Sequence, residues 1–166
     1  MTFPLLNPTA QATLNTLRSK FNFNLVPGKA ALKKTESALG DLTAKIEIVN
    51  GSFHGSLAIA FTEQTILSFT QQLVNETYLT INTTVKDAAC DLATIIGSGV
   101  KQHFAQLGVT IDLKHPSVTV GYNQNIVHPL PGTKIVFPFN SEDGIIFLET
   151  CFHCFKENPF PSAEAA

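Results

Sequence analysis

The chain has 166 residues, of which 44% are hydrophobic and 14% are charged, and its formal net charge is −2. A chain of this length is expected to form one domain, residues 1–156, around a single core. The balanced charge argues against nucleic acid as a partner. No apolar run reaches the roughly 20 residues of a membrane span, and the N-terminus lacks a signal-peptide pattern. We therefore expect a cytoplasmic protein without membrane insertion, whose three cysteines are reduced.

A first helix is predicted near the N-terminus. Asn7 is a suitable N-cap, Pro8 is favoured at the first helical position, and apolar residues recur at helical spacing until about Phe21. The segment from there to Gly40 contains turn residues and lysines, so it is expected to be extended or irregular.

Two alternating segments then predict a β-hairpin. Apolar residues occupy every second position in residues 41–49 and again in residues 53–61, and Asn50-Gly51 stands between the two segments. Asn-Gly is a strong signal for the tight turn that joins paired strands.

Two further helices are predicted in the middle of the chain. Thr62 can cap a helix that ends near Asn75, and a longer helix spans about Thr83 to Leu107, with Gly108 as the residue that closes it. One face of the longer helix is apolar at a period near 3.6 residues. The residues of that face are Val85, Ala88, Ala89, Leu92, Ile95, Ile96, Gly99, Val100, Phe104 and Leu107.

The remaining segments alternate as strands do. The predicted strands are residues 110–113, 118–122, 133–139 and 145–155, with a turn at residues 140–144. The element order predicts an α+β fold with a largely antiparallel sheet and helices packed on one face. The polar, proline-containing residues 157–166 are expected to form a mobile C-terminal tail.

A polar row lies opposite the apolar face of the longest helix. Asp87, Asp91 and Thr94 stand at positions i, i+4 and i+7, which places them on one side of the helix. Such a row is ordinarily a solvated helix face, so the spacing alone does not establish a site.

The Cys151-Phe152-His153-Cys154 segment has the spacing of a metal or redox motif, but it lies in a predicted strand. Positions three apart in a strand point to opposite faces, so both thiols cannot ligate one ion. The favoured interpretation is a cysteine in the core and a histidine outside, with no metal bound.

The five histidines lie in five different segments, and none of them has the spacing of a metal-binding or catalytic motif. They are His54, His103, His115, His128 and His153. Each is interpreted as a surface or satisfied polar residue. A Ser-His-Asp triad stays open, although Gly97-Ser98-Gly99 lies within a helical pattern and is no nucleophile elbow. The two glycines indicate close approach of another element or a weak point in the helix.

Several segments together resemble the CheX members of the CheC/CheX/FliY family, which are phosphatases of chemotaxis response regulators. The resemblance covers about residues 10–155, and it is carried by residues 27–43, the hairpin end at 55–61 and the helix motif. The family motif is Asp or Ser, three residues, Glu, two residues, Asn, and a Pro some twenty residues on. Asp87, Asp91, Thr94 and Pro116 fall on these positions, with identity at the first and last only.

The resemblance implies a role for each motif position. In the family the Glu pairs with a lysine of the phosphorylated receiver, and the Asn amide orients the water that attacks the aspartyl phosphate. Asp91 keeps the charge on a shorter side chain, whereas Thr94 replaces the amide with a hydroxyl of shorter reach.

Three functional interpretations remain open. The protein is a weak or modified aspartyl-phosphate phosphatase acting on a CheY-like receiver, in which Asp91 docks and Thr94, helped by Asp87, holds the water. Alternatively it is an inactive module that binds a receiver or a related signalling protein through Asp87, Asp91 and Pro116, or a structural module without a receiver partner. No cofactor is expected, because any Mg²⁺ belongs to the receiver. The resemblance implies a homodimer through sheet edges, and residues 145–155 are expected to form a strand with an unprotected edge.

Overall fold

The computed structural model describes residues 3–21 and 23–156, except for the side chains of Phe3 and Pro4. In this part of the chain three helices are formed, α1 (Phe3–Lys20), α2 (Glu63–Val74) and α3 (Thr83–Gln106). The strands are β1 (Val26–Pro27), β2 (Ala31–Leu32), β3 (Leu42–Asn50), β4 (Phe53–Phe61), β5 (Asp112–Leu113), β6 (Ser117–Val120), β7 (Lys134–Ser141) and β8 (Gly144–Cys154). None of the described helices is long and apolar enough to span a bilayer. The predicted tail, residues 157–166, lies outside the described residues.

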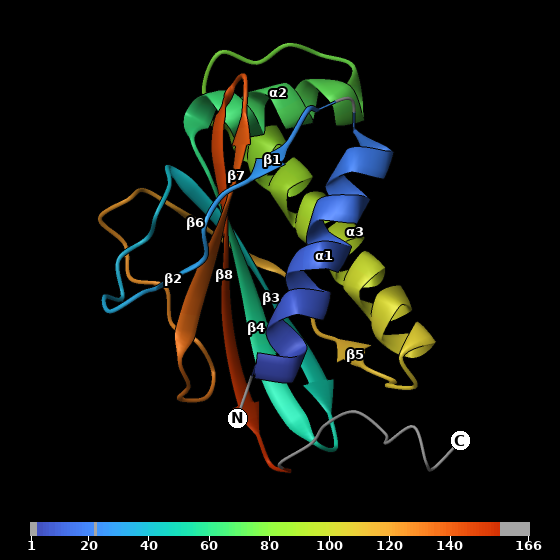
Figure 1. Cartoon of the computed structure of the whole chain (residues 1–166). Coiled ribbons are helices and arrows are strands. Elements are labelled where there is room, and N and C mark those ends of the chain that lie inside the picture. The colour runs from blue at the N-terminus through green and yellow to red at the C-terminus, as the bar shows by residue number, and fades with distance from the viewer. Residues whose placement is uncertain (1–2, 22, 157–166) are drawn as a thin grey trace.

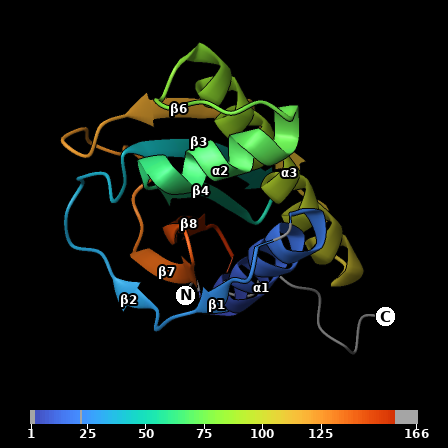
Figure 2. The ribbon, with the colours of Figure 1, turned by 90° about the horizontal axis from the view of Figure 1, so that it is seen from above.

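One antiparallel sheet organises the fold. Its order is β1-β7-β8-β4-β3-β5, while β2 also pairs with β7 and β6 also pairs with β3. The helices α1 and α3 cover one face, α2 closes one end of that layer, and the loops around β2 and β6 lie on the other side (Figures 1 and 2). The predicted α+β fold, with a largely antiparallel sheet and helices on one face, is confirmed. We call the face under the helices the helix face and the opposite one the loop face.

The predicted hairpin is present as β3 and β4. Its register pairs Leu42 with Phe61 and Asn50 with Phe53, so the two-residue loop is Gly51-Ser52, one position later than the Asn-Gly turn indicated by the sequence. The side chain of Asn50 accepts a hydrogen bond from the Ser52 N–H at 2.7 Å, which satisfies a donor at the turn.

The predicted start of the first helix, at Pro8, is wrong by five residues. The helix begins at Phe3, and Pro8 lies inside it although proline usually starts a helix. Burial explains the extra turn, because Leu5 is fully buried and Leu6 is 7% exposed in the core that the helix covers. The local N-cap signal of Asn7 is therefore outweighed by the apolar contacts of the residues before it.

The expectation of an unprotected edge at residues 145–155 is also wrong. The strand β8 pairs with β4 along Phe53–Phe61 and with β7 along Lys134–Ser141, so it lies inside the sheet. One edge is covered by β7, which directly precedes β8 in the chain, and the other by β4, which comes from a distant part of the chain. Alternation within one strand does not show which distant strand will pair with it.

The two glycines in the middle of α3 mark close packing, as one of the sequence interpretations predicts. A Cβ on Gly97 would stand 3.0 Å from Ile46 Cδ1 of β3, and one on Gly99 would stand 1.9 Å from Thr16 Oγ1 of α1. The absence of a side chain at these positions lets α3 lie directly against the sheet and against α1.

Candidate functional site

The helix α3 is fixed at both ends and along its buried face. The Asn82 side chain accepts a hydrogen bond from the Val85 N–H at 3.0 Å, and Gly108 follows the helix end with φ 81°. Nine of its residues are buried, among them Leu92 and Ile96. The opposite side of α3 is therefore held in a defined direction, toward solvent.

The predicted row of Asp87, Asp91 and Thr94 lies on this exposed side. Cys90 lies between the two aspartates along the helix and is half-buried. Burial, followed by the negative charges of Asp87 and Asp91, raises the pKa of the Cys90 thiol. The row is thus a surface of negative potential with a thiol kept protonated beside it.

Thr94 is engaged with its own helix. Its Oγ1 donates to the backbone carbonyl oxygen of Cys90 at 3.0 Å, a bond that serine and threonine often form with the residue four positions earlier. A hydroxyl has one hydrogen, so in this conformation Thr94 can only accept a hydrogen bond from a molecule outside the helix.

Pro116 is held close to Thr94 by the edge of the sheet. On one side Leu113 of β5 pairs with Ile48, and on the other Ser117 of β6 pairs with Lys45, so the connection between them is anchored on β3 at both ends. In this connection the N–H of Lys114 also donates to the Glu47 carbonyl oxygen at 3.0 Å.

A depression of about 480 Å³ opens between this connection and α3. It is lined by Ile46, Thr94, Leu113, Lys114, His115 and Pro116. Of the four predicted site residues, Thr94 and Pro116 are brought together here, whereas Asp87 and Asp91 do not line the depression and are exposed farther along the same side of α3. Lys114 and His115 were not predicted as site residues, and their position directly before Pro116 was the available signal.

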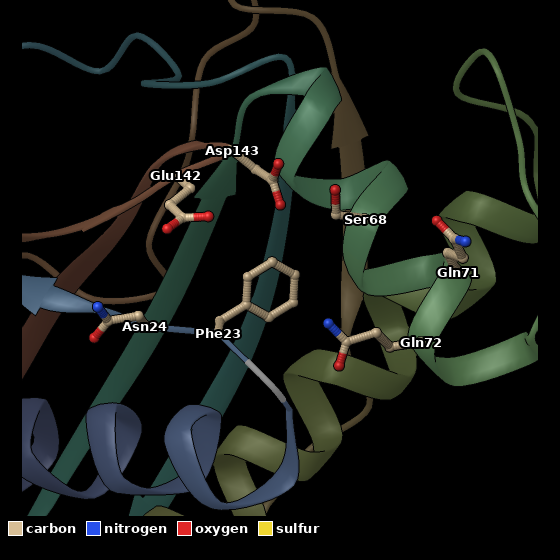
Figure 3. A pocket seen from close by; sticks show the side chains of 7 residues that line it. All are labelled: Phe23, Asn24, Ser68, Gln71, Gln72, Glu142 and Asp143. Carbon is tan, nitrogen blue, oxygen red and sulfur yellow. The ribbon is translucent and has the colours of Figure 1, made fainter.

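Another depression, of about 500 Å³, contains none of the predicted residues. Figure 3 shows Phe23 at its centre, with Glu142 and Asp143 of the β7–β8 loop on one side and Ser68 and Gln72 of α2 on the other. The Phe23 ring is stacked on Phe69 at a centroid distance of 4.2 Å, so it belongs to the core on one side. This depression is separate from the surface that the motif marks.

A buried polar network on the loop face was not predicted. The Ser56 hydroxyl is hydrogen-bonded to His128 Nδ1, His128 Nε2 lies 2.8 Å from Glu149 Oε1, and Lys33 Nζ donates to Glu149 Oε2 at 2.6 Å. The order of hydroxyl, imidazole and carboxylate is that of a hydrolase triad, but Ser56 is fully buried and offers no access to a substrate. His128 is a satisfied polar residue that fastens a loop to the sheet.

Glu149 stays ionised in this network although it is only 2% exposed. Burial by itself raises the pKa of a carboxyl, but hydrogen bonds from His128 and Lys33, together with their positive charge, outweigh it and hold the pKa of Glu149 below its ordinary value.

The two cysteines of the CxxC segment point to opposite faces of β8, as strand alternation predicts. Cys151 is buried on the loop face, where its Sγ lies 3.7 Å from the Leu130 carbonyl oxygen, and Cys154 packs against the core on the helix face. The His153 ring nitrogen Nδ1 lies 3.0 Å from the Pro131 carbonyl oxygen. Among the described residues, no three His, Cys, Asp or Glu side chains are grouped as metal ligands.

Comparisons with known proteins agree on one family. The family model described as chemotaxis phosphatase CheX matches residues 42–140. A CheC-like superfamily protein from Shewanella sp. PV-4 has 34% identity and a TM-score of 0.81, over 92% of this chain and 99% of that one. The chemotaxis protein CheX from Vibrio vulnificus has 31% identity and a TM-score of 0.80, over 90% and 99% of the two chains.

A more distant structure shares the fold. The CheX of a CheX-CheY-BeF3-Mg²⁺ complex from Borrelia burgdorferi has 21% identity and a TM-score of 0.73, over 89% of this chain and 97% of that one. A comparison with curated proteins gave no match.

Proposed function

Because this chain belongs to the CheX family of chemotaxis phosphatases, we propose that it docks a phosphorylated receiver domain on the exposed side of α3 and removes its phosphate slowly. The partner is a CheY-like receiver or a related signalling protein. A relative from Borrelia burgdorferi was crystallised in complex with CheY, which supports this class of partner.

One observation carries the proposal. Asp87, Asp91 and Thr94 are all exposed along one side of a helix, and Thr94 shares a depression with Pro116, the fourth position of the family motif. Thr94 and Pro116 thus share one depression although 22 positions separate them in the sequence, and this supports a common docking surface with the aspartates on the same side of α3. A receiver that reaches Asp91 would also cover Thr94.

The proposed roles follow from charge and reach. Asp91 supplies the negative charge that pairs with the receiver's lysine, and Thr94 accepts a hydrogen bond from the attacking water. The water oxygen then bonds to phosphorus, the bond from phosphorus to the aspartyl oxygen breaks, and inorganic phosphate and a free receiver carboxylate result after loss of a proton. Catalysis of this kind rests on positioning and electrostatics.

The opposite side of the depression carries basic groups. Lys114 and His115 line it from the β5–β6 connection, across from Thr94. A phosphorylated receiver presents phosphate and carboxylate groups, so this side is suited to attract it, while the aspartates of α3 take its lysine. Lys114 Nζ lies 4.0 Å from Glu47 Oε2, and the Lys114 side chain is 57% exposed, so it remains accessible to a partner.

A second candidate function is receiver binding without turnover. The bond from Thr94 to the Cys90 carbonyl favours it, because Thr94 has no hydrogen left to donate and cannot reproduce the donor and acceptor of an amide. A misplacement of about 1 Å in a catalytic site can lower the rate about a hundredfold.

Single-turnover kinetics separate the two. A Mg²⁺-loaded receiver of the same organism is phosphorylated and its loss of phosphate is followed with and without this chain. We expect acceleration over spontaneous decay that Asp91→Ala abolishes, while Glu142→Ala, which removes an exposed carboxylate on the β7–β8 loop, leaves it unchanged. Saturable binding without acceleration would establish the second candidate instead, and no binding to any cognate receiver would contradict both.

We also propose a homodimer, on the family resemblance. Strand pairing between two copies cannot use β8, because both of its edges are already paired, and the outermost strands of the described sheet are β1, β2, β5 and β6. Light scattering after gel filtration tests this proposal. We expect the mass of two chains, and the mass of one chain would contradict it. We further propose that residues 1–156 form one domain and that the protein is cytoplasmic.

A further inference from the structure

The loop face of the sheet carries a polar depression that the docking surface does not use. Two neighbouring pairs of β3 and β6 point into it, since Thr43 lies opposite Thr119 and Lys45 lies opposite Ser117. The loop segment 125–127 forms the remaining wall, and the enclosed volume is about 190 Å³. The lining residues are Thr43, Lys45, Ser117, Thr119, Asn125, Ile126 and Val127.

The Thr43 hydroxyl has no hydrogen-bond partner among the described residues. The residue is 2% exposed, and its Oγ1 is buried. Buried polar atoms are nearly always paired, so an unpaired hydroxyl at a polar depression indicates that a polar group from outside the fold completes it.

Lys45 gives the depression its charge. Its ammonium group donates to the Val127 carbonyl oxygen and has two further hydrogens, because a lysine carries three donors. No acidic residue lines the depression. The nearest carboxylate along the same face of β3, Glu47, lies 3.1 Å from His54 Nε2 and 4.0 Å from Lys114 Nζ. Lys45 therefore has no competing carboxylate among the lining residues.

The wall of the depression is already in place. The N–H of Ile126 donates to the Glu36 carbonyl oxygen at 2.7 Å, and the N–H of Ala38 donates to the Gln124 carbonyl oxygen at 2.8 Å. Ile126 is buried together with Ala38 and Ala58. A site held in this way loses little conformational entropy when it binds.

We propose that this depression binds a small oxyanion, a phosphate or a carboxylate group. The Lys45 ammonium supplies the opposite charge, and the hydroxyls of Thr43, Ser117 and Thr119 donate to the oxygens. Charge-assisted hydrogen bonds of this kind are the strong ones. The volume is that of about six water molecules, at ~30 Å³ each, which is enough for one such group with a small substituent.

The site is distinct from the receiver surface. Ile46 and Pro116 line the depression beside Thr94, whereas their chain neighbours Lys45 and Ser117 line this one, on the opposite side of the same strands. Its existence does not depend on the proposed function, and it is tested without a receiver.

The test is a titration at constant ionic strength, with inorganic phosphate in one arm and acetate in the other, followed by the amide resonances of residues 117–119 and 125–127. Saturation by phosphate identifies a phosphate-bearing ligand, and saturation by acetate alone identifies a carboxylate. Shifts that grow without saturation in both arms would overturn the proposal.

Two variants assign the binding to these residues. Lys45→Met is expected to weaken it about tenfold or more, and Thr43→Val, which keeps the shape and removes the hydroxyl, is expected to weaken it several-fold. Lys101→Met removes an exposed lysine of α3 and serves as the charge control. Equal weakening by Lys101→Met and Lys45→Met would show that only net charge matters and would refute the site.

Discussion

The hydroxyl of Thr94 donates its hydrogen to the carbonyl oxygen of Cys90, one turn earlier on α3, at a distance of 3.0 Å. This bond turns the side chain back on its own helix, at the position where the family carries an amide. Thr94 therefore differs from the family's Asn in what it can offer a water. Its hydroxyl can accept a hydrogen bond from the water, but it has no hydrogen left to donate.

The first prediction concerns this residue. Thr94→Asn combined with Asp91→Glu is expected to raise the rate of receiver dephosphorylation by on the order of ten- to a hundredfold, because the amide offers donor and acceptor at a longer reach. Single-turnover decay of a phosphorylated receiver measures this. Thr94→Val is the matched control without a hydroxyl; unchanged activity in that variant would mean that Thr94 holds no water.

A second prediction follows from the charges around Cys90. Because Asp87 and Asp91 both raise the pKa of its thiol, Asp87→Asn together with Asp91→Asn should lower that pKa and increase the thiolate fraction at a given pH. Alkylation of Cys90 by iodoacetamide, measured on the modified peptide at mildly alkaline pH, should then be faster. The internal control is Cys154, whose pKa is raised mainly by burial and whose rate should not change.

The third prediction concerns the pH dependence of stability. The folded-state pKa of Glu149 lies below its ordinary value of 4.5, so its stabilising effect is fully present above that pH and is lost as the pH falls through the lower folded value. Glu149→Gln should therefore flatten the acid side of the stability profile. At neutral pH it should destabilise the fold by about 3–5 kcal/mol, because Lys33 is left buried without its partner.

Urea unfolding at several pH values measures this effect. Glu36→Gln is the comparison variant, since Glu36 is an exposed carboxylate paired with Lys134 and should change stability little. If the free energy of unfolding of Glu149→Gln fell with acid as steeply as that of the parent protein, Glu149 would not be the source of this pH dependence.

A fourth prediction tests the packing between β4 and β8. Gly55 lies opposite Phe152, and a Cβ on Gly55 would stand 2.2 Å from the ring atom Cδ1 of Phe152, which is 1% exposed. Since that ring cannot move into solvent, Gly55→Ala should destabilise the fold by about 1–3 kcal/mol. Gly51→Ala in the hairpin loop, where a Cβ meets nothing within 4 Å, should be neutral or slightly stabilising. Similar effects of both variants on urea unfolding would rule out the overpacking.

Much of the fold could be predicted because its signals are local. Thr62 and Asn75 mark the ends of α2, Gly108 follows α3, and the alternation of residues 41–61 produces the hairpin, each through interactions between residues that lie close together in the sequence. The start of α1 could not be predicted, because the burial of Leu5 and Leu6 depends on elements far along the chain.

Only the part of the candidate site that depends on local spacing or on the family resemblance could be predicted. The spacing of Asp87, Asp91 and Thr94 follows from helix geometry, and resemblance to a family supplied Pro116. The positions of Lys114 and His115 beside Thr94, and the fastening of His128 to Glu149 and Ser56, depend on how β5 and the β6–β7 loop meet the sheet.

By itself the sequence determined the elements, their order and the exposed acidic row, because the helical and strand periods are properties of consecutive residues. The tertiary structure alone decided that β4 covers the second edge of β8, how Thr94 uses its one hydrogen, and that Thr43 is buried beside Lys45 without a partner. Each of these depends on side-chain direction and on segments that meet only after folding, and no local period encodes such contacts.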